Sequence, residues 1–133
     1  APATFDFLGF THICAGSRRG RFTVHLRTMR KRLRRSLKAV AHWCQQHRHD
    51  PVVGQAAALN RKLRGHYQYY GRPTNYHGLW QFYRVVRRVW KKWLNRRTRG
   101  KTLTWNDYAH LLELHPLVRP RITHAWASAG SSV

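Results

Sequence analysis

Positive charge dominates this sequence and restricts the folds open to it. The chain of 133 residues contains 26 Lys and Arg against 4 Asp and Glu, a formal net charge of +22. Cations closer together than a Debye length, about 8–10 Å at physiological salt, repel one another and oppose compaction unless an anion neutralises them. We therefore expect the basic side chains to lie on the surface and the partner to be a polyanion, either nucleic acid or a membrane surface.

The apolar content is sufficient for a hydrophobic core. Hydrophobic residues make up 42% and aromatic residues 13% of the chain, whereas a disordered basic tail would contain few of either. The length fits one domain. Cys14 and Cys44 are far apart in the sequence and predict neither a disulfide framework nor a zinc site. No export signal or apolar run of membrane-spanning length is apparent, so we expect a cytoplasmic protein that does not act on membranes.

The first part of the chain predicts a β-hairpin over residues 5–26. Its second arm, residues 22–26, alternates between apolar and polar residues, and its first arm carries phenylalanines on both sides of a break at Gly9. Residues 15–20 supply the turn. An isolated hairpin is only marginally stable, so we expect this one to pack against the rest of the chain.

Three long helices are expected after the hairpin, near residues 28–48, 51–70 and 76–97. Apolar residues recur there every three to four positions, which is the period of a helix with one buried face. The third segment has an apolar arc wide enough to pack against two neighbours, which makes it the central helix. The predicted fold class is mainly α, with an N-terminal β-hairpin followed by a three-helix bundle and a short C-terminal helix.

Cap patterns place two of the helix starts. Asp50 before Pro51 predicts an N-cap followed by proline at the first helical position. Thr104 and Asp107 have the spacing of a capping box, which predicts a short helix ending near residue 114. We expect a hairpin unit over residues 1–26, a helical domain over 27–122 and a flexible tail over 123–133.

The second predicted helix has a face of small residues. Two glycines interrupt it, each costing about 1 kcal/mol relative to alanine, and close approach of another backbone would explain them. Two interpretations are open: packing on a neighbouring helix, or contact with the wide, shallow minor groove of A-form RNA. The residues of this face are Gly54, Ala57, Ala58, Arg61, Gly65 and Gln68.

The third predicted helix has a line of cations opposite its apolar arc. Arg84, Arg88, Lys91 and Asn95 follow one another at the spacing of a single helix face. Phosphates carry no sequence information, so binding through this line should show little sequence preference. Most aromatic residues fall on apolar stripes and are expected in the core; the candidates for stacking on bases are Tyr69, Tyr76 and Trp105.

The sequence offers little for catalysis. Its four carboxylates, Asp6, Asp50, Asp107 and Glu113, are too scattered to form a paired-acid or two-metal site. The histidines around residue 47 would point to different sides of a helix and do not predict a metal site. We expect no enzyme activity, no metal and no cofactor in this chain.

Two segments resemble the C-terminal part of group II intron reverse transcriptase/maturases. Residues 5–10 read FDFLGF and residues 59–70 read LNRKLRGHYQYY. The second matches the family pattern Leu-Asn-x-x-Leu-Arg-Gly-x-x-x-Tyr-(Tyr/Phe), and the resemblance extends over about residues 5–122. In that family the FLGF segment ends the palm and begins the primer-grip hairpin. The three helices that follow form the thumb, also called the maturase-specific or X domain.

The resemblance implies an RNA-binding module of a mobile element protein. It would grip template–primer duplex and structured intron RNA, and so assist reverse transcription and RNA splicing, beside the fingers and palm of a full-length protein. The family's catalytic aspartate motif does not occur in this sequence, so we expect a fragment or a standalone maturase domain without polymerase activity. Mg²⁺ is expected only in the missing palm and in the intron RNA.

These considerations give three sets of candidate residues and no catalytic residue. The expected RNA-binding residues are Arg34, Lys38, Arg61, Lys62, Arg64, Gln68, Arg84, Arg88 and Lys91. The expected close-approach face is formed by Gly54, Ala58 and Gly65, and the segment resembling a primer grip by Phe7, Leu8, Gly9 and Phe10.

Two other function classes remain open. A non-specific cationic protein that packages nucleic acid or disrupts membranes predicts basic residues all round and no organised core. A helix-turn-helix DNA binder predicts a compact recognition helix after a tight turn. The turn at residues 71–75 is short enough for that, but the helices on either side of it are expected to be about 20 residues long.

Overall fold

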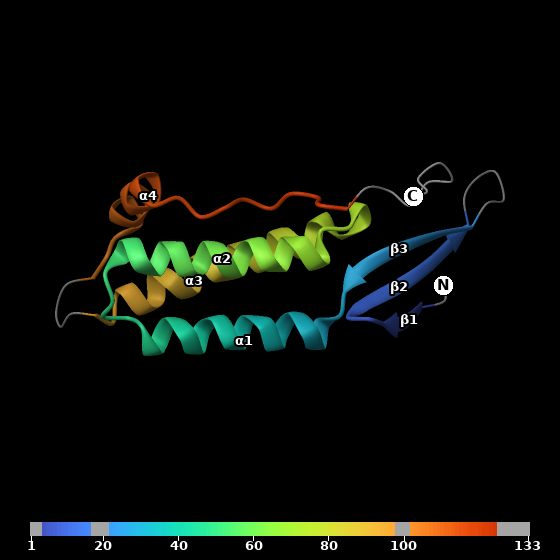
Figure 1. Ribbon diagram of the computed structural model, residues 1–133, viewed down its shortest axis with the longest axis horizontal. Helices are drawn as coiled ribbons and strands as arrows, with labels where there is room; N and C mark the ends of the chain where they lie inside the picture. Colours follow the sequence, from blue (N-terminus) through green and yellow to red (C-terminus); the bar gives the residue numbers. More distant parts are fainter. Residues whose placement is uncertain (1–3, 17–21, 98–101, 125–133) are drawn as a thin grey trace.

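The computed structural model describes residues 4–16, 22–97 and 102–124 and forms an elongated helical bundle with a small sheet at one end (Figure 1). Figure 1 also shows α4 near the opposite end of the bundle and an extended C-terminal segment running beside α2. The elements in chain order are β1 (Thr4–Phe7), β2 (Phe10–Gly16), β3 (Phe22–Thr28), α1 (Arg30–Gln46), α2 (Val52–Tyr70), a 3₁₀ helix (Pro73–Asn75), α3 (Tyr76–Leu94) and α4 (Trp105–Leu114). The predicted fold class is confirmed, and each of the three long helices lies within one to three residues of its predicted bounds.

The sheet has three strands in the order β1-β2-β3, because the first arm of the predicted hairpin folds back on itself. Leu8 and Gly9 both have positive φ angles, 52° and 85°, and form a two-residue turn that pairs Phe7 with Phe10 in antiparallel register. Backbones of this kind match the right-handed twist of two adjacent strands. The break at Gly9 is therefore a second, tighter hairpin. Most of the predicted turn at residues 15–20 lies outside the described residues.

The core lies between α1, α2 and α3, with additional residues from α4 and the C-terminal segment. Leu59, Leu63 and Leu79 are fully buried, and Trp90 and Tyr67 are nearly so. These residues come from the predicted apolar stripes, and α3 supplies more of the core than any other element. The hypothesis of a cationic protein without an organised core is not consistent with this packing.

The helix starts agree only in part with the predicted caps. Thr104 and Asp107 form the predicted capping box: the Asp107 amide donates to Thr104 Oγ1 at 3.1 Å and the Thr104 amide donates to Asp107 Oδ2 at 3.2 Å. The prediction for α2 is wrong by one residue, because Pro51 occupies the N-cap and no side chain caps the helix. Asp50 lies in the loop before it.

Buried amides join the sheet to the helices. Asn75 Oδ1 accepts from the Thr28 amide at 2.9 Å, and Asn75 Nδ2 donates to Thr28 Oγ1 at 2.7 Å and to the Tyr70 carbonyl at 2.9 Å. Beside it, Thr74 Oγ1 accepts from the Leu26 amide at 2.7 Å. The end of β3 is thereby fixed to the connection between α2 and α3.

A second buried amide, Gln55, connects helices at the other end of the bundle. Its Oε1 accepts from Trp90 Nε1 at 2.7 Å, and its Nε2 donates to the His47 and Asp50 carbonyls at 2.7 and 3.1 Å. The side chain thus connects α2, α3 and the loop after α1, and satisfies polar groups that burial would otherwise leave unpaired.

The extended segment of residues 115–124 is fixed along α2. Asn60 donates to the Pro116 carbonyl at 2.9 Å and accepts from the Val118 amide at 2.8 Å, and Tyr67 Oη donates to the Val118 carbonyl at 2.7 Å. The Thr123 amide donates to the Gly71 carbonyl at 3.0 Å. The predicted tail therefore begins in ordered structure at Thr123, and residues 125–133 lie outside the described part.

Candidate nucleic-acid interface

The three long helices carry many cations and no carboxylate at all. The four acidic residues lie elsewhere: Asp6 in β1, Asp50 in the loop before α2, and Asp107 and Glu113 in α4. The basic side chains of α1, α2 and α3 therefore have no acidic neighbour on their own helix. Uncompensated charge of this kind raises the local concentration of a polyanion and is suited to binding one.

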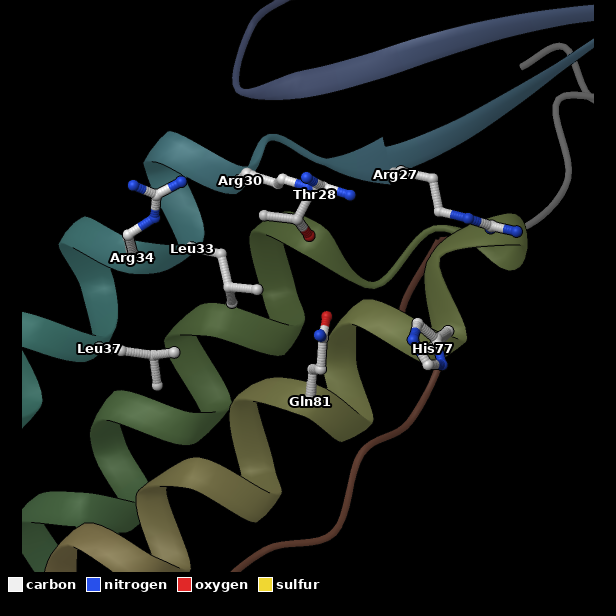
Figure 2. A pocket seen from close by; sticks show the side chains of 8 residues that line it. All are labelled: Arg27, Thr28, Arg30, Leu33, Arg34, Leu37, His77 and Gln81. Atoms are coloured by element: carbon white, nitrogen blue, oxygen red, sulfur yellow. The ribbon is translucent and has the colours of Figure 1, made fainter.

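A cationic hollow of about 470 Å³ lies where β3 meets α1 and α3. Leu33, Leu37 and the buried Thr28 contribute to its lining, together with Arg27, Arg30, Arg34, His77 and Gln81. Figure 2 shows Gln81 extending from α3 toward Thr28, with the arginines on the β3 and α1 side. Apolar groups between arginines suit a sugar–phosphate backbone, which presents ribose faces between its charges.

Of the predicted RNA-binding residues, only Arg34 lines this hollow. Arg34 also lines a neighbouring hollow of about 270 Å³ on the outer face of α1, together with Lys31, Arg35 and the predicted Lys38. Arg27, Arg30, His77 and Gln81 were not predicted, because they come from three elements, β3, α1 and α3, that only the folded chain brings together. Their charge in the sequence is the one signal that could have identified the arginines.

The predicted cationic line on α3 is only partly free. Arg84 and Arg88 are exposed, and the Arg84 guanidinium lies 5.7 Å from the centre of the Trp80 ring. Lys91 is half-buried, with its Nζ 4.3 Å from the centre of the Trp105 ring. Asn95 accepts a hydrogen bond from the Leu103 amide at 2.5 Å and so holds the chain that leads to α4.

The glycines of α2 face open space. An added Cβ at Gly54 or Gly65 would meet nothing within 4 Å, so these two positions are not contacts between helices. Arg61, between them on the same face, is exposed. Ala58 was predicted to share the face but is buried. The exposed part of the helix surface therefore covers a smaller arc than the spacing of the small residues suggests.

The remaining predicted residues of α2 surround this open face without joining the cations of α3. Arg64 and Gln68 are exposed, and Lys62 Nζ lies 5.5 Å from the centre of the Trp43 ring of α1. Arg64, Gln68 and Lys62 are not among the residues that line the hollow of Figure 2, and Lys62 instead lines a hollow between α1 and α2. The candidate interface therefore includes the open face of α2 as well as the hollow formed by β3, α1 and α3.

The segment resembling a primer grip is a turn docked on the end of α2. The Leu8 carbonyl accepts from Tyr69 Oη at 2.7 Å, and the buried Phe10 ring stacks on Tyr69 with centres 5.8 Å apart. A Cβ at Gly9 would lie 3.2 Å from Tyr70 Oη. Gly9 and Phe10 are thus packing residues and Leu8 is exposed, whereas the side chain of Phe7 lies outside the described part.

His66 and Cys44 are titratable groups that the fold buries. His66 stacks on Phe82 with ring centres 3.7 Å apart, and burial lowers the pKa of its imidazole to about 4, so it is uncharged at neutral pH. Burial raises the pKa of the Cys44 thiol to about 12, which keeps it protonated and unreactive. Cys44 is a free cysteine that packs in the core.

Comparison with protein-family models, with curated proteins and with solved structures found no match to this chain. Within residues 4–16, 22–97 and 102–124, none of the helices combines the length and apolar character needed to cross a membrane. Over the same ranges no three His, Cys, Asp or Glu residues are grouped so that they could hold a metal ion.

Proposed function

We propose that this chain is an RNA-binding module that holds A-form duplex and structured RNA, as the thumb of the group II intron maturases that its sequence resembles. On this proposal it assists splicing and reverse transcription by binding and has no catalytic activity of its own. The proposal extends to an RNA/DNA template–primer duplex, which is also close to A-form, and to a fingers-and-palm portion acting beside it.

The observation that carries the proposal concerns the segment of residues 59–70. The fold accounts for most of its motif: Leu59 and Leu63 are core residues, Asn60 holds the C-terminal segment, and Tyr69 and Tyr70 pack against Phe10. Two residues of the pattern are left over, because Arg64 and Gly65 are exposed. A glycine that destabilises its helix by about 1 kcal/mol and fills no space in the fold fits the approach of a partner's backbone.

The shape of this face favours A-form duplex over other polyanions. A helix surface that carries glycines can lie close to the wide, shallow minor groove, where Arg61, Arg64 and Gln68 would reach phosphates and 2′-hydroxyls. A helix-turn-helix protein would instead insert one end of a short recognition helix into a major groove. Here α2 and α3 each have 19 residues, and the open face extends along α2 from Gly54 to Gln68.

A size series at Gly65 tests the proposal. Gly65→Ala is expected to stabilise the fold by about 1 kcal/mol, since Ala is the better helix former and its Cβ meets open space. Gly65→Leu should also leave the fold intact but hold RNA away from the helix. We expect it to weaken binding to duplex RNA by about ten-fold, a loss of about 1.4 kcal/mol.

Ala109→Leu is the matched control, because Ala109 is an exposed helical residue of α4 far from α2 in the sequence. Thermal melts and binding titrations at one salt concentration should be run on all four proteins. Equal RNA affinity in wild type and Gly65→Leu, with both folded, would contradict the proposed contact.

The cations of α3 should contribute through phosphates alone. Replacing Arg84, Arg88 and Lys91 together by Ala is expected to reduce the slope of log K against log salt by about 2–3 units, a little under one per lost phosphate contact. All RNA sequences should be weakened alike, because phosphates carry no sequence information. The measurement is a salt titration of duplex RNA binding, with heparin as competitor. An unchanged slope, together with displacement by heparin as effective as by duplex RNA of matched charge, would identify a non-specific cationic protein instead.

A further inference from the structure

The junction between α3 and α4 forms a second cationic hollow with an aromatic ring in its wall. Its volume is about 400 Å³, within the range of ligand pockets in proteins. The lining residues are Arg88, Lys91, Lys92, Asn95, Arg96 and Trp105. No carboxylate is among them, so the hollow favours an anion, and Trp105 adds a surface on which a planar group can stack.

Trp105 is exposed although its position is firmly held. It is the first residue of α4, between the capping-box residues Thr104 and Asp107. The preceding Leu103 is fixed by its hydrogen bond to Asn95 of α3. Trp105 nevertheless keeps 64% of its surface accessible, and its ring meets that of Tyr108 only obliquely, with ring centres 6.3 Å apart. The fold therefore holds this ring in place but leaves most of its surface without packing contacts.

The cations around Trp105 are arranged for a ligand with both a ring and a phosphate. Lys91 Nζ lies 4.3 Å from the centre of the indole ring, so one positive charge is in contact with the aromatic surface. Arg88, Lys92 and Arg96 provide further donors in the same hollow. A nucleotide matches this combination, because its base can stack on the indole while its phosphates meet the lysines and arginines.

The other exposed aromatic residues lack this setting. Tyr69 is engaged by the Leu8 carbonyl and the Phe10 ring. Tyr76 packs its ring edge-on against Trp80, with centres 6.0 Å apart, and lines neither this hollow nor that of Figure 2. Of the three residues considered for stacking from the sequence, Trp105 alone combines exposure with surrounding phosphate-binding groups.

We propose that the hollow formed by Trp105, Lys91, Arg88, Lys92 and Arg96 binds an unpaired nucleotide of RNA, with its base stacked on Trp105. The inference rests on the proposed RNA-binding function and deepens it: the preferred ligand is a duplex that continues into a single strand, not a blunt duplex. The site reads the presence of a base and not its identity, since every base has a face that can stack.

The test compares three RNAs at fixed ionic strength: a blunt duplex, the same duplex with a short single-stranded extension, and the same extension built from abasic nucleotides. The two extended RNAs carry equal charge and differ only in their bases. We expect wild type to bind the base-containing extension about ten-fold more tightly than the abasic one, within the range for stacking on an aromatic side chain. Trp105→Ala should abolish that difference and leave binding of the blunt duplex within about two-fold of wild type, since phosphate contacts remain.

Two further variants separate stacking from structure. Trp105→Phe keeps a ring and should retain most of the preference, whereas Trp105→Leu keeps an apolar side chain of similar bulk and should lose it. Tyr76→Ala removes an exposed aromatic residue outside the hollow and should behave as wild type. The inference is wrong if wild type does not distinguish base from abasic extension, or if Trp105→Leu retains the preference.

The outcomes also separate this inference from the proposed function. Binding of the blunt duplex without any preference for the base-containing extension would remove the nucleotide site and leave the RNA-binding proposal standing. Failure of wild type to bind any of the three RNAs would overturn both. Free AMP should compete only at millimolar concentration; displacement of the extended RNA by micromolar AMP would identify a free-nucleotide site and overturn the assignment to RNA.

Discussion

Replacing Leu63 by Asp is expected to unfold the protein. Leu63 is fully buried in the middle of α2, among the residues of the common core, and the nearby His66 imidazole is uncharged at neutral pH because burial lowers its pKa to about 4. A charge or an unpaired polar group there should destabilise the fold by several kcal/mol, about 4 or more, which is comparable with the whole stability of a small domain. The measurement is circular dichroism during thermal and urea unfolding.

Val53→Asp is the matched control, because it introduces the same carboxylate into the same helix at a position that is 65% exposed. Val53 lies in the first turn of α2, where a negative charge is neutral to slightly favourable. We expect its stability to stay within about 0.5 kcal/mol of wild type. A Leu63→Asp protein that melts like wild type would show that α2 does not bury this face.

Replacing Asn75 by Leu should produce the second largest loss of stability. Asn75 is fully buried, and its side chain satisfies the Thr28 amide, Thr28 Oγ1 and the Tyr70 carbonyl. Leucine fills the space but leaves these groups without partners, at about 1–3 kcal/mol for each buried group that water does not reach. We expect Asn75→Leu to lower the free energy of unfolding by about 3–5 kcal/mol. In this variant the Thr28 amide should exchange its hydrogen faster than the amides in the middle of α3.

Asn106→Leu provides the comparison, since Asn106 is an exposed residue of α4 and should change stability by less than about 0.5 kcal/mol. Asn75→Asp refines the result, because it keeps an acceptor for the Thr28 amide but loses the donor to Tyr70. A loss below about 1 kcal/mol for Asn75→Leu would mean that water replaces the amide and that the sheet is not held through it.

Much of the helical architecture could be predicted from local patterns. The apolar stripes of α2 and α3 specify a face as well as a conformation, because residues three and four apart share one side of a helix. Leu59, Leu63 and Trp90 accordingly lie where the periodicity places them. The capping box at Thr104 was predictable for the same reason, since its partners are three residues apart.

The polar side chains that hold the fold together were not predictable in this way. Asn75 and Gln55 are polar residues of types that usually lie on the surface. Their partners Thr28 and Trp90 lie 47 and 35 positions away in the sequence. The contacts of Asn60 with residues 116 and 118 span 56 and 58 positions. No local period links such residues, so only the assembled fold shows which amides are buried and satisfied.

The candidate interface was likewise predictable in some features and not in others. The sequence by itself determined that cations dominate, that α1, α2 and α3 carry no acids, and that glycines interrupt α2, since charge and residue type need no partner to be known. Only the tertiary structure decided that Gly54 and Gly65 are open while Ala58 is buried, that Lys91 rests on Trp105, and that Arg27 and Arg30 meet Gln81 across a hollow. The physical reason is that exposure and proximity depend on which elements pack together, and that packing is set by contacts between residues far apart in the chain.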